Sequence, residues 1–240
     1  MSLFNLFGNA KAAQAPAVMA EMLKRGKSPD QCKCIDFFVG IEGNGNSKGG
    51  CLKPKEWTID DYCAHVQRMV DELNLKQRAM TKIGLDESQI SEIRPICLSS
   101  FLRGSDLYVK TSEDYSKYVT NKYSVTWIFF SATQLYTYTY TLDTTSDNVT
   151  EFTRDFFYSD ITCIRTEHEV EEVIYEIKGM AAGCKGCLKK APENKYQRNH
   201  RHWDTLQITV PNDSYSFCCR TTNTLEQSIQ AAKAMIREKK

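Results

Sequence analysis

The sequence lacks long apolar runs and carries almost no net charge. No window approaches the roughly 18 uninterrupted apolar residues of a membrane-spanning helix. The first residues have neither the basic start nor the long apolar run of a signal peptide. The 31 Lys and Arg residues offset the 30 Asp and Glu residues to a formal charge of +1, so no global field favours nucleic acid or a membrane surface. We therefore expect a cytoplasmic chain with no transmembrane segment.

Histidine is also scarce, with four residues in the chain, so few general bases are available for catalysis. No Gly-x-Ser-x-Gly nucleophile motif occurs. Residues 43–50 are glycine-rich but lack the Gly-Lys-Ser/Thr ending of a phosphate-binding loop, and His168-Glu-Val-Glu-Glu172 lacks the second histidine of a zinc-protease motif. The sequence therefore favours a protein that is not an enzyme and needs no cofactor, with an unrecognised enzyme as an alternative.

Cysteine, by contrast, is plentiful, with ten residues. Cytoplasmic thiols stay reduced, so these side chains are expected to act as small buried apolar groups or as metal ligands rather than as disulfides. The chain is otherwise ordinary for a globular protein, with 41% hydrophobic and 25% charged residues. At about 150 residues per domain, its length of 240 residues corresponds to one domain and an appendage.

Helical periodicity dominates the chain before Pro95. Thr58 and Asp61 have the spacing of a capping box, and a stripe of apolar residues with a 3.6-residue period follows them. These patterns predict a helical N-terminal region over residues 1–94, with a glycine-rich loop at 40–50. The predicted helices cover residues 11–25, 58–83 and 86–92, and the short apolar run at 34–39 is a possible strand.

After Pro95 the pattern changes to that of β-strands. Runs rich in Thr, Tyr, Val, Ile and Phe are separated by turn residues such as Pro211-Asn-Asp213. The chain then closes with an amphipathic helix over residues 224–238. The fold class is therefore α+β, with a β-domain at 95–240. The seven predicted strands cover residues 123–130, 134–142, 149–158, 161–165, 169–177, 203–210 and 214–219, and residues 96–101 are a possible eighth.

This order of elements resembles the pleckstrin-homology-like fold. Tyr158-Ser-Asp-Ile-Thr162 is similar to a strand opening seen in small bacterial members, and the hairpin at 127–136, the strand at 203–210 and the final helix also fit. The resemblance covers residues 95–240 and implies a seven-stranded antiparallel barrel or sandwich capped by the C-terminal helix. It further implies a bacterial protein and a scaffold that binds lipid, peptide or protein and is seldom catalytic. Fold alone does not choose among these ligands.

The near-zero net charge conceals two oppositely charged segments. Residues 143–176 hold ten acidic residues and two arginines, or −8, whereas residues 178–203 hold seven basic residues and one acidic residue, or +6. Such runs are commonly solvated surfaces, but they also permit docking to an anionic surface or complementary self-association. The candidate basic patch consists of Lys185, Lys189, Lys190, Lys195, Arg198 and Arg201.

The basic segment also contains a candidate zinc site. Cys184 and Cys187 have the C-x2-C spacing that presents two thiolates to a tetrahedral ion, and His200 and His202 follow at nearly a zinc-finger interval. The His-x-His spacing departs from the usual His-x3–5-His, so a loop without metal is the competing interpretation. A second, weaker arrangement combines Cys32, Cys34 and Cys51.

Together these patterns predict a non-enzymatic binding or assembly module that engages a protein partner or associates with itself. The alternative is a zinc-stabilised regulatory module that uses the predicted loop from Cys184 to His202. Phosphoinositide binding is not expected, because Arg94, Arg103 and Lys110 are too few to surround a phosphate. The aromatic residues of the strands at 123–140 are interpreted as core and cross-strand packing residues rather than as a stacking platform for nucleic acid.

Overall fold

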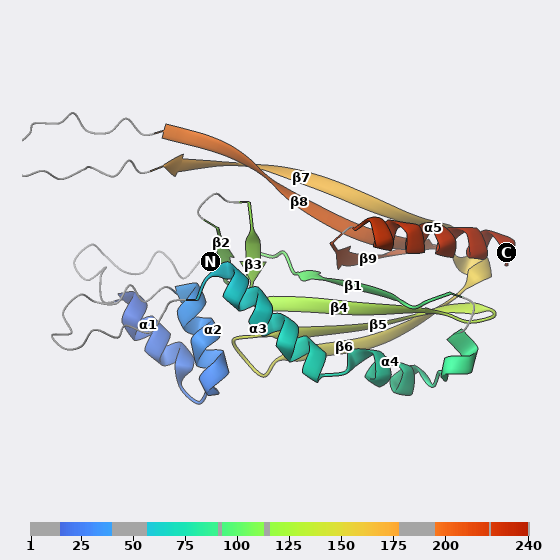
Figure 1. Cartoon of the computed structure of the whole chain (residues 1–240), viewed down its shortest axis with the longest axis horizontal. Helices are drawn as coiled ribbons and strands as arrows, with labels where there is room; N and C mark the ends of the chain where they lie inside the picture. Colours follow the sequence, from blue (N-terminus) through green and yellow to red (C-terminus); the bar gives the residue numbers. More distant parts are fainter. Residues whose placement is uncertain are drawn as a thin grey trace, which may run out of the picture.

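The computed structural model describes residues 15–39, 57–90, 93–112, 116–177, 195–220 and 222–239. Over these ranges the chain is α+β, with helices first, antiparallel strands next and one helix after them (Figure 1). The helices are α1 (Ala15–Lys24), α2 (Pro29–Val39), α3 (Ile59–Glu72), α4 (Leu75–Ile83) and α5 (Asn223–Glu238), and short 3-10 turns lie at Glu87–Ile90 and Tyr158–Asp160.

The described strands form three separate antiparallel sheets. The larger sheet has the order β1-β4-β5-β6 and contains β1 (Ile96–Phe101), β4 (Lys122–Phe130), β5 (Gln134–Asp143) and β6 (Val149–Phe157). A short hairpin pairs β2 (Val109–Thr111) with β3 (Tyr118–Thr120), and a third sheet has the order β7-β8-β9, with β7 (Cys163–Ile177), β8 (Lys195–Val210) and β9 (Asp213–Cys219).

The described sheets do not close into a barrel, so the barrel form of the sequence prediction is wrong. The 3-10 turn at Tyr158–Asp160 interrupts the chain between β6 and β7, and these two strands are not neighbours in any sheet described. The predicted strands at 161–165 and 169–177 are one continuous strand, β7. The short strands β2 and β3 were missed, because three residues are too few to show a period.

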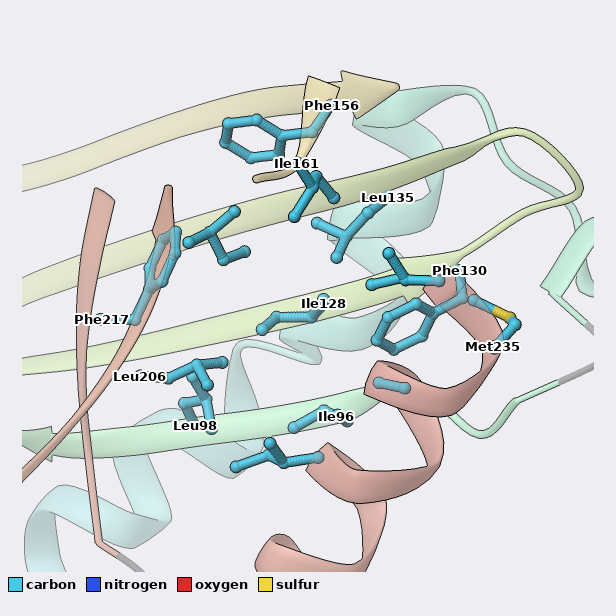
Figure 2. Packing of buried hydrophobic residues seen from close by; sticks show 14 of the residues in the cluster. Ile96, Leu98, Ile128, Phe130, Leu135, Phe156, Ile161, Leu206, Phe217 and Met235 are labelled. Atoms are coloured by element: carbon cyan, nitrogen blue, oxygen red, sulfur yellow. The ribbon is translucent and has the colours of Figure 1, made fainter. Parts of the chain in front are cut away.

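Each face of the larger sheet is covered by a different set of elements. One face packs against the β7-β8-β9 sheet and α5, and Figure 2 shows side chains from all three meeting there. On the opposite face, α4 packs onto β4 and β5. Burial on both faces makes this sheet the centre of the molecule. The first core includes Leu98, Ile128, Phe130, Leu135, Leu206, Phe217 and Met235, and the second includes Leu75, Met80, Val125, Phe129, Tyr138 and Tyr140.

The predicted helix at 58–83 is divided into α3 and α4. Its start is confirmed, because the Thr58 hydroxyl accepts a hydrogen bond from the Asp61 N–H at 3.1 Å and the Asp61 carboxylate accepts one from the Thr58 N–H at 2.9 Å. The division lies at Asn74, which has a left-handed φ of 44°. Asparagine tolerates this conformation better than most residues do. Gly84, with φ 77°, ends α4 as the sequence predicted.

The possible strand at 34–39 is instead part of helix α2. Its apolar residues Phe37 and Phe38 pack on Tyr62 of α3, with the Phe37 and Tyr62 rings stacked at 4.6 Å. Val119 of β3 lies in the same cluster. Residues of the predicted N-terminal region therefore share cores with the strands.

Candidate functional site on a long hairpin

The β7–β8 hairpin is the longest strand pair in the described residues. Its register runs without interruption from Cys163 opposite Thr209 to Ile177 opposite Lys195. Residues 195–202 belong to the predicted loop from Cys184 to His202 but are strand, because each pairs with a residue of β7. Figure 1 shows both strands continuing well past the end of β9. The distal half of β7 and β8 thus forms a two-stranded arm.

The opposite charges predicted for this part of the chain partly meet within the arm. Arg198 lies 3.3 Å from Glu172, and Arg201 lies 4.0 Å from Glu171, in each case across the two strands. Lys185, Lys189 and Lys190 of the predicted basic patch lie outside the described residues, and Lys195 is the first residue of β8. Arg198 and Arg201 therefore each pair with an acidic residue of their own chain.

One face of the arm is anchored to the body of the protein. Arg103, which follows β1, pairs with Glu169 at 2.7 Å and lies 4.4 Å from the centre of the Trp203 ring. The Tyr118 ring of β3 packs edge-to-face with the same indole, with ring centres 4.8 Å apart, and the Arg201 guanidinium lies 5.1 Å from the centre of the Tyr118 ring. These contacts hold the base of the arm against β1 and the β2–β3 hairpin.

The opposite face of the arm is open. Val170 and Ile174 share this face because side chains alternate along a strand, and they are 49% and 59% exposed. Glu172 lies between them, and Arg198 is opposite Ile174 in the register. Two exposed branched apolar residues therefore adjoin one acidic and one basic side chain.

The same face carries a chain of hydrogen bonds between two histidines and an aspartate. His168 Nδ1 lies 2.6 Å from Asp204 Oδ1, and His168 Nε2 lies 3.1 Å from His202 Nδ1. The two imidazole rings are 5.2 Å apart and inclined by 25°. His168 is directly opposite Asp204 and diagonal to His202, which explains why their side chains meet.

This arrangement differs from the predicted zinc site. Cys184 and Cys187 lie outside the described residues, and His202 contacts His168 rather than serving as part of a His200–His202 pair. His200 lies opposite Glu172 on the exposed part of β8. In the ranges that the structure covers, no group of three or more His, Cys, Asp and Glu side chains is placed to hold a metal. His168 was missed because its partner is 34 residues away and only the strand register brings them together.

The described cysteines are free thiols, as expected, and several are shielded from reaction. Burial raises the pKa of Cys34 to about 12, and burial also raises the pKa of Cys63 and Cys218. A protonated thiol is a poor metal ligand and nucleophile. Cys34 therefore acts as a core residue of α2, and Cys51, the third member of its predicted cluster, lies outside the described residues. The free cysteines are Cys32, Cys34, Cys63, Cys97, Cys163, Cys218 and Cys219.

An open groove of about 490 Å³ lies between α4 and β6. At its edge Glu151 accepts two hydrogen bonds from Arg78, at 3.0 and 2.8 Å, and one from the Tyr138 hydroxyl at 2.7 Å. Lys82 lies 3.1 Å from the same carboxylate. Because these charged groups pair with one another, the groove is better explained as a surface ion-pair cluster than as a ligand site. Its lining consists of Leu73, Asn74, Gln77, Arg78, Thr81, Lys82 and Glu151.

Replacing Glu151 by Gln should destabilise the protein in a pH-dependent way. The hydrogen bonds from Arg78 lower the pKa of Glu151 from 4.5 to about 2. A carboxylate with a lowered folded-state pKa stabilises the fold fully above its unfolded-state pKa, and this stabilisation is lost as the pH falls through the folded-state pKa. We expect Glu151→Gln to lower the free energy of unfolding by about 1–2 kcal/mol near neutral pH, allowing for solvent screening.

The measurement is urea unfolding of the unchanged protein and the variant at several pH values from about 7 down to about 2. The difference between their free energies of unfolding should shrink as the pH approaches about 2. Glu167→Gln is the matched control, because Glu167 pairs with Arg165 where both side chains are exposed, and its loss should change the free energy by less than about 0.5 kcal/mol. A Glu151→Gln effect that is constant with pH would contradict the assignment.

Comparison with protein-family models, curated proteins and solved structures returned no match. None of the helices in the described part of the chain is both long enough and apolar enough to cross a membrane.

Proposed function

We propose that this chain is a non-enzymatic binding module that associates with a second copy of itself through the open face of the β7–β8 arm. The observation that carries this proposal is the exposure of Val170 and Ile174 on one face of a long hairpin. A two-fold symmetric interface must be complementary to itself. Glu172 and Arg198 supply both signs of charge on this face, so a second copy can place each charge near its opposite.

The order of the strands supports a binding scaffold of the pleckstrin-homology-like kind. We propose that β1, β4, β5 and β6 correspond to the first sheet of that fold and β7, β8 and β9 to the second, with α5 as the closing helix. On this proposal the β2–β3 hairpin is an insertion between the first two strands.

The cationic side chains near β1 and β2 favour a protein partner over a phosphoinositide. Arg103 pairs with Glu169 and packs on Trp203. Lys110 donates to the Phe37 carbonyl oxygen at 2.8 Å and lies over the Phe37 ring at 4.2 Å. Phosphate binding would require these groups to leave their partners within the protein.

The proposal predicts a concentration-dependent dimer. Sedimentation velocity of the full chain should show monomers converting to dimers in the micromolar range, and raising the salt from about 0.05 M to about 0.5 M should weaken the dimer because exposed charges are screened. The double variant Val170→Ser/Ile174→Ser should raise the dissociation constant at least about tenfold, which corresponds to about 1.4 kcal/mol.

Val149→Ser is the matched control, because Val149 is also an exposed valine on a strand but belongs to β6. This variant should dimerise like the unchanged protein. A chain that stays monomeric at every concentration and salt level would disprove self-association, and equal dimerisation of the double variant would exclude the arm as its interface.

A further inference from the structure

The hydrogen bond from His168 to Asp204 fixes the state of the His168 ring. A carboxylate accepts hydrogen bonds, so the Nδ1 of His168, at 2.6 Å, carries the proton. In the neutral ring the lone pair is then on Nε2. Metal-binding histidines commonly have this arrangement, in which a carboxylate holds the other ring nitrogen and orients the ligand.

The other ring nitrogen of His168 is hydrogen-bonded to a second imidazole. His168 Nε2 and His202 Nδ1 are 3.1 Å apart. Two nitrogen ligands at about 2.0–2.1 Å from a tetrahedral zinc ion lie about 3.3 Å apart. In adjacent positions of a square-planar ion with similar bond lengths they lie about 2.9 Å apart. The observed separation falls between these values, so an ion can replace the shared hydrogen bond once the rings turn to direct both lone pairs at it.

We propose that His168 and His202 bind a divalent transition-metal ion, with Asp204 as a positioning residue. Imidazole nitrogens suit zinc, copper and nickel. Water occupies the remaining coordination positions. The site differs from the predicted zinc site, because its second histidine is His168 and it does not need Cys184 or Cys187.

The position of the pair on the hairpin favours binding from solution. The His168 side chain is 54% exposed, so an ion can reach Nε2. Asp204 is much less exposed and lies in β8, which is paired on both sides, with β7 and with β9. His168 and His202 lie just beyond the end of the β8–β9 pairing and are held by the β7–β8 ladder, so their backbone is already ordered before an ion binds.

The pair lies on the same open face as the surface proposed for self-association, with Val170 directly opposite His202, but neither Val170 nor Ile174 supplies a ligand. Val170 and Ile174 lie further along the arm than His168, toward its distal end. Each chain contains both imidazoles, so a monomer can bind the ion. The variant Val170→Ser/Ile174→Ser should therefore keep the metal site even where it loses the dimer, which distinguishes the two proposals.

The test is calorimetric titration of zinc chloride into untagged full-length protein that has been cleared of metal with a chelator. One ion per chain is expected. His168→Gln and His202→Gln should each weaken binding about 100-fold, and Asp204→Asn should weaken it about tenfold, because loss of an outer carboxylate costs about 10- to 100-fold in affinity. His200→Gln and the double variant Cys184→Ser/Cys187→Ser should bind zinc like the unchanged protein.

A second measurement identifies the ligands directly, so that a variant that fails to fold is not mistaken for one that has lost a ligand. Copper(II) bound to the unchanged protein should give an electron paramagnetic resonance spectrum with coupling to two imidazole nitrogens, and His168→Gln should leave coupling to one. Circular dichroism checks that each variant is folded. Zinc binding that survives both His168→Gln and His202→Gln, or that disappears in the cysteine variant alone, would overturn the proposal, as would a failure of the unchanged protein to bind zinc.

Discussion

Replacing Phe129 by Ala is expected to lower the free energy of unfolding by about 3–5 kcal/mol. The Phe129 side chain is completely buried between the larger sheet and α4, in a cluster that also contains Met80 and Tyr138. Truncation leaves a cavity that the neighbouring strands cannot fill. Urea unfolding followed by circular dichroism measures the change. Because the cavity lies between the predicted N-terminal region and the sheet, the number of transitions in the unfolding curve also tests whether the two unfold together.

Phe157 provides the control for this prediction. It is also a phenylalanine on a strand, but its side chain is 53% exposed at the end of β6. Phe157→Ala should change the free energy of unfolding by no more than about 0.5 kcal/mol, as is usual for exposed positions. If Phe129→Ala lowered the free energy of unfolding as little as Phe157→Ala, the packing of α4 on the sheet would contribute little.

Tyr62→Ala is expected to destabilise the protein by about 4 kcal/mol. Tyr62 is fully buried, and its ring stacks on Phe37. Its hydroxyl lies 2.8 Å from the Thr120 carbonyl oxygen and 2.9 Å from the Thr144 hydroxyl. The residue therefore connects α2 and α3 to β3 and to the turn after β5. The unfolding temperature and the urea midpoint should both fall.

Tyr62→Phe separates the ring from the hydroxyl. This variant keeps the stacking on Phe37 but leaves buried polar groups of Thr120 and Thr144 short of a partner, so it should cost about 1–3 kcal/mol. Tyr136→Phe is the control, because the Tyr136 hydroxyl bonds the side chain of Gln134 where water can replace it. A Tyr62→Phe variant as stable as the unchanged protein would contradict the role of the buried hydroxyl.

Much of the fold could be predicted because its signals are local. The capping box of Thr58 and Asp61 fixes the start of α3, and the structure confirms it. The strands predicted at 123–130 and 134–142 match β4 and β5 to within one residue, because Tyr and Thr alternate along β5 and β4 consists largely of aromatic and β-branched residues. In each case neighbouring residues alone determine the backbone.

The parts that could not be predicted depend on residues far apart in the sequence. Residues 195–202 are rich in charge and were placed in a loop, yet pairing with β7 makes them strand. That same register brings His168 beside His202, a contact that spacing along the chain does not reveal. The division between α3 and α4 was missed because one asparagine, Asn74, adopts a left-handed conformation inside an otherwise continuous apolar stripe.

The position of α5 in the chain has a consequence for folding during synthesis. Ile229, Ala232, Met235 and Ile236 fill one side of the core between the two larger sheets, and they follow every strand in chain order. On a ribosome the strands emerge first, and their apolar inner faces stay open until this helix has been made. We therefore expect the nascent chain to need protection from aggregation after β9 has been made and before α5 has been made, when the inner faces of its sheets lack their covering helix.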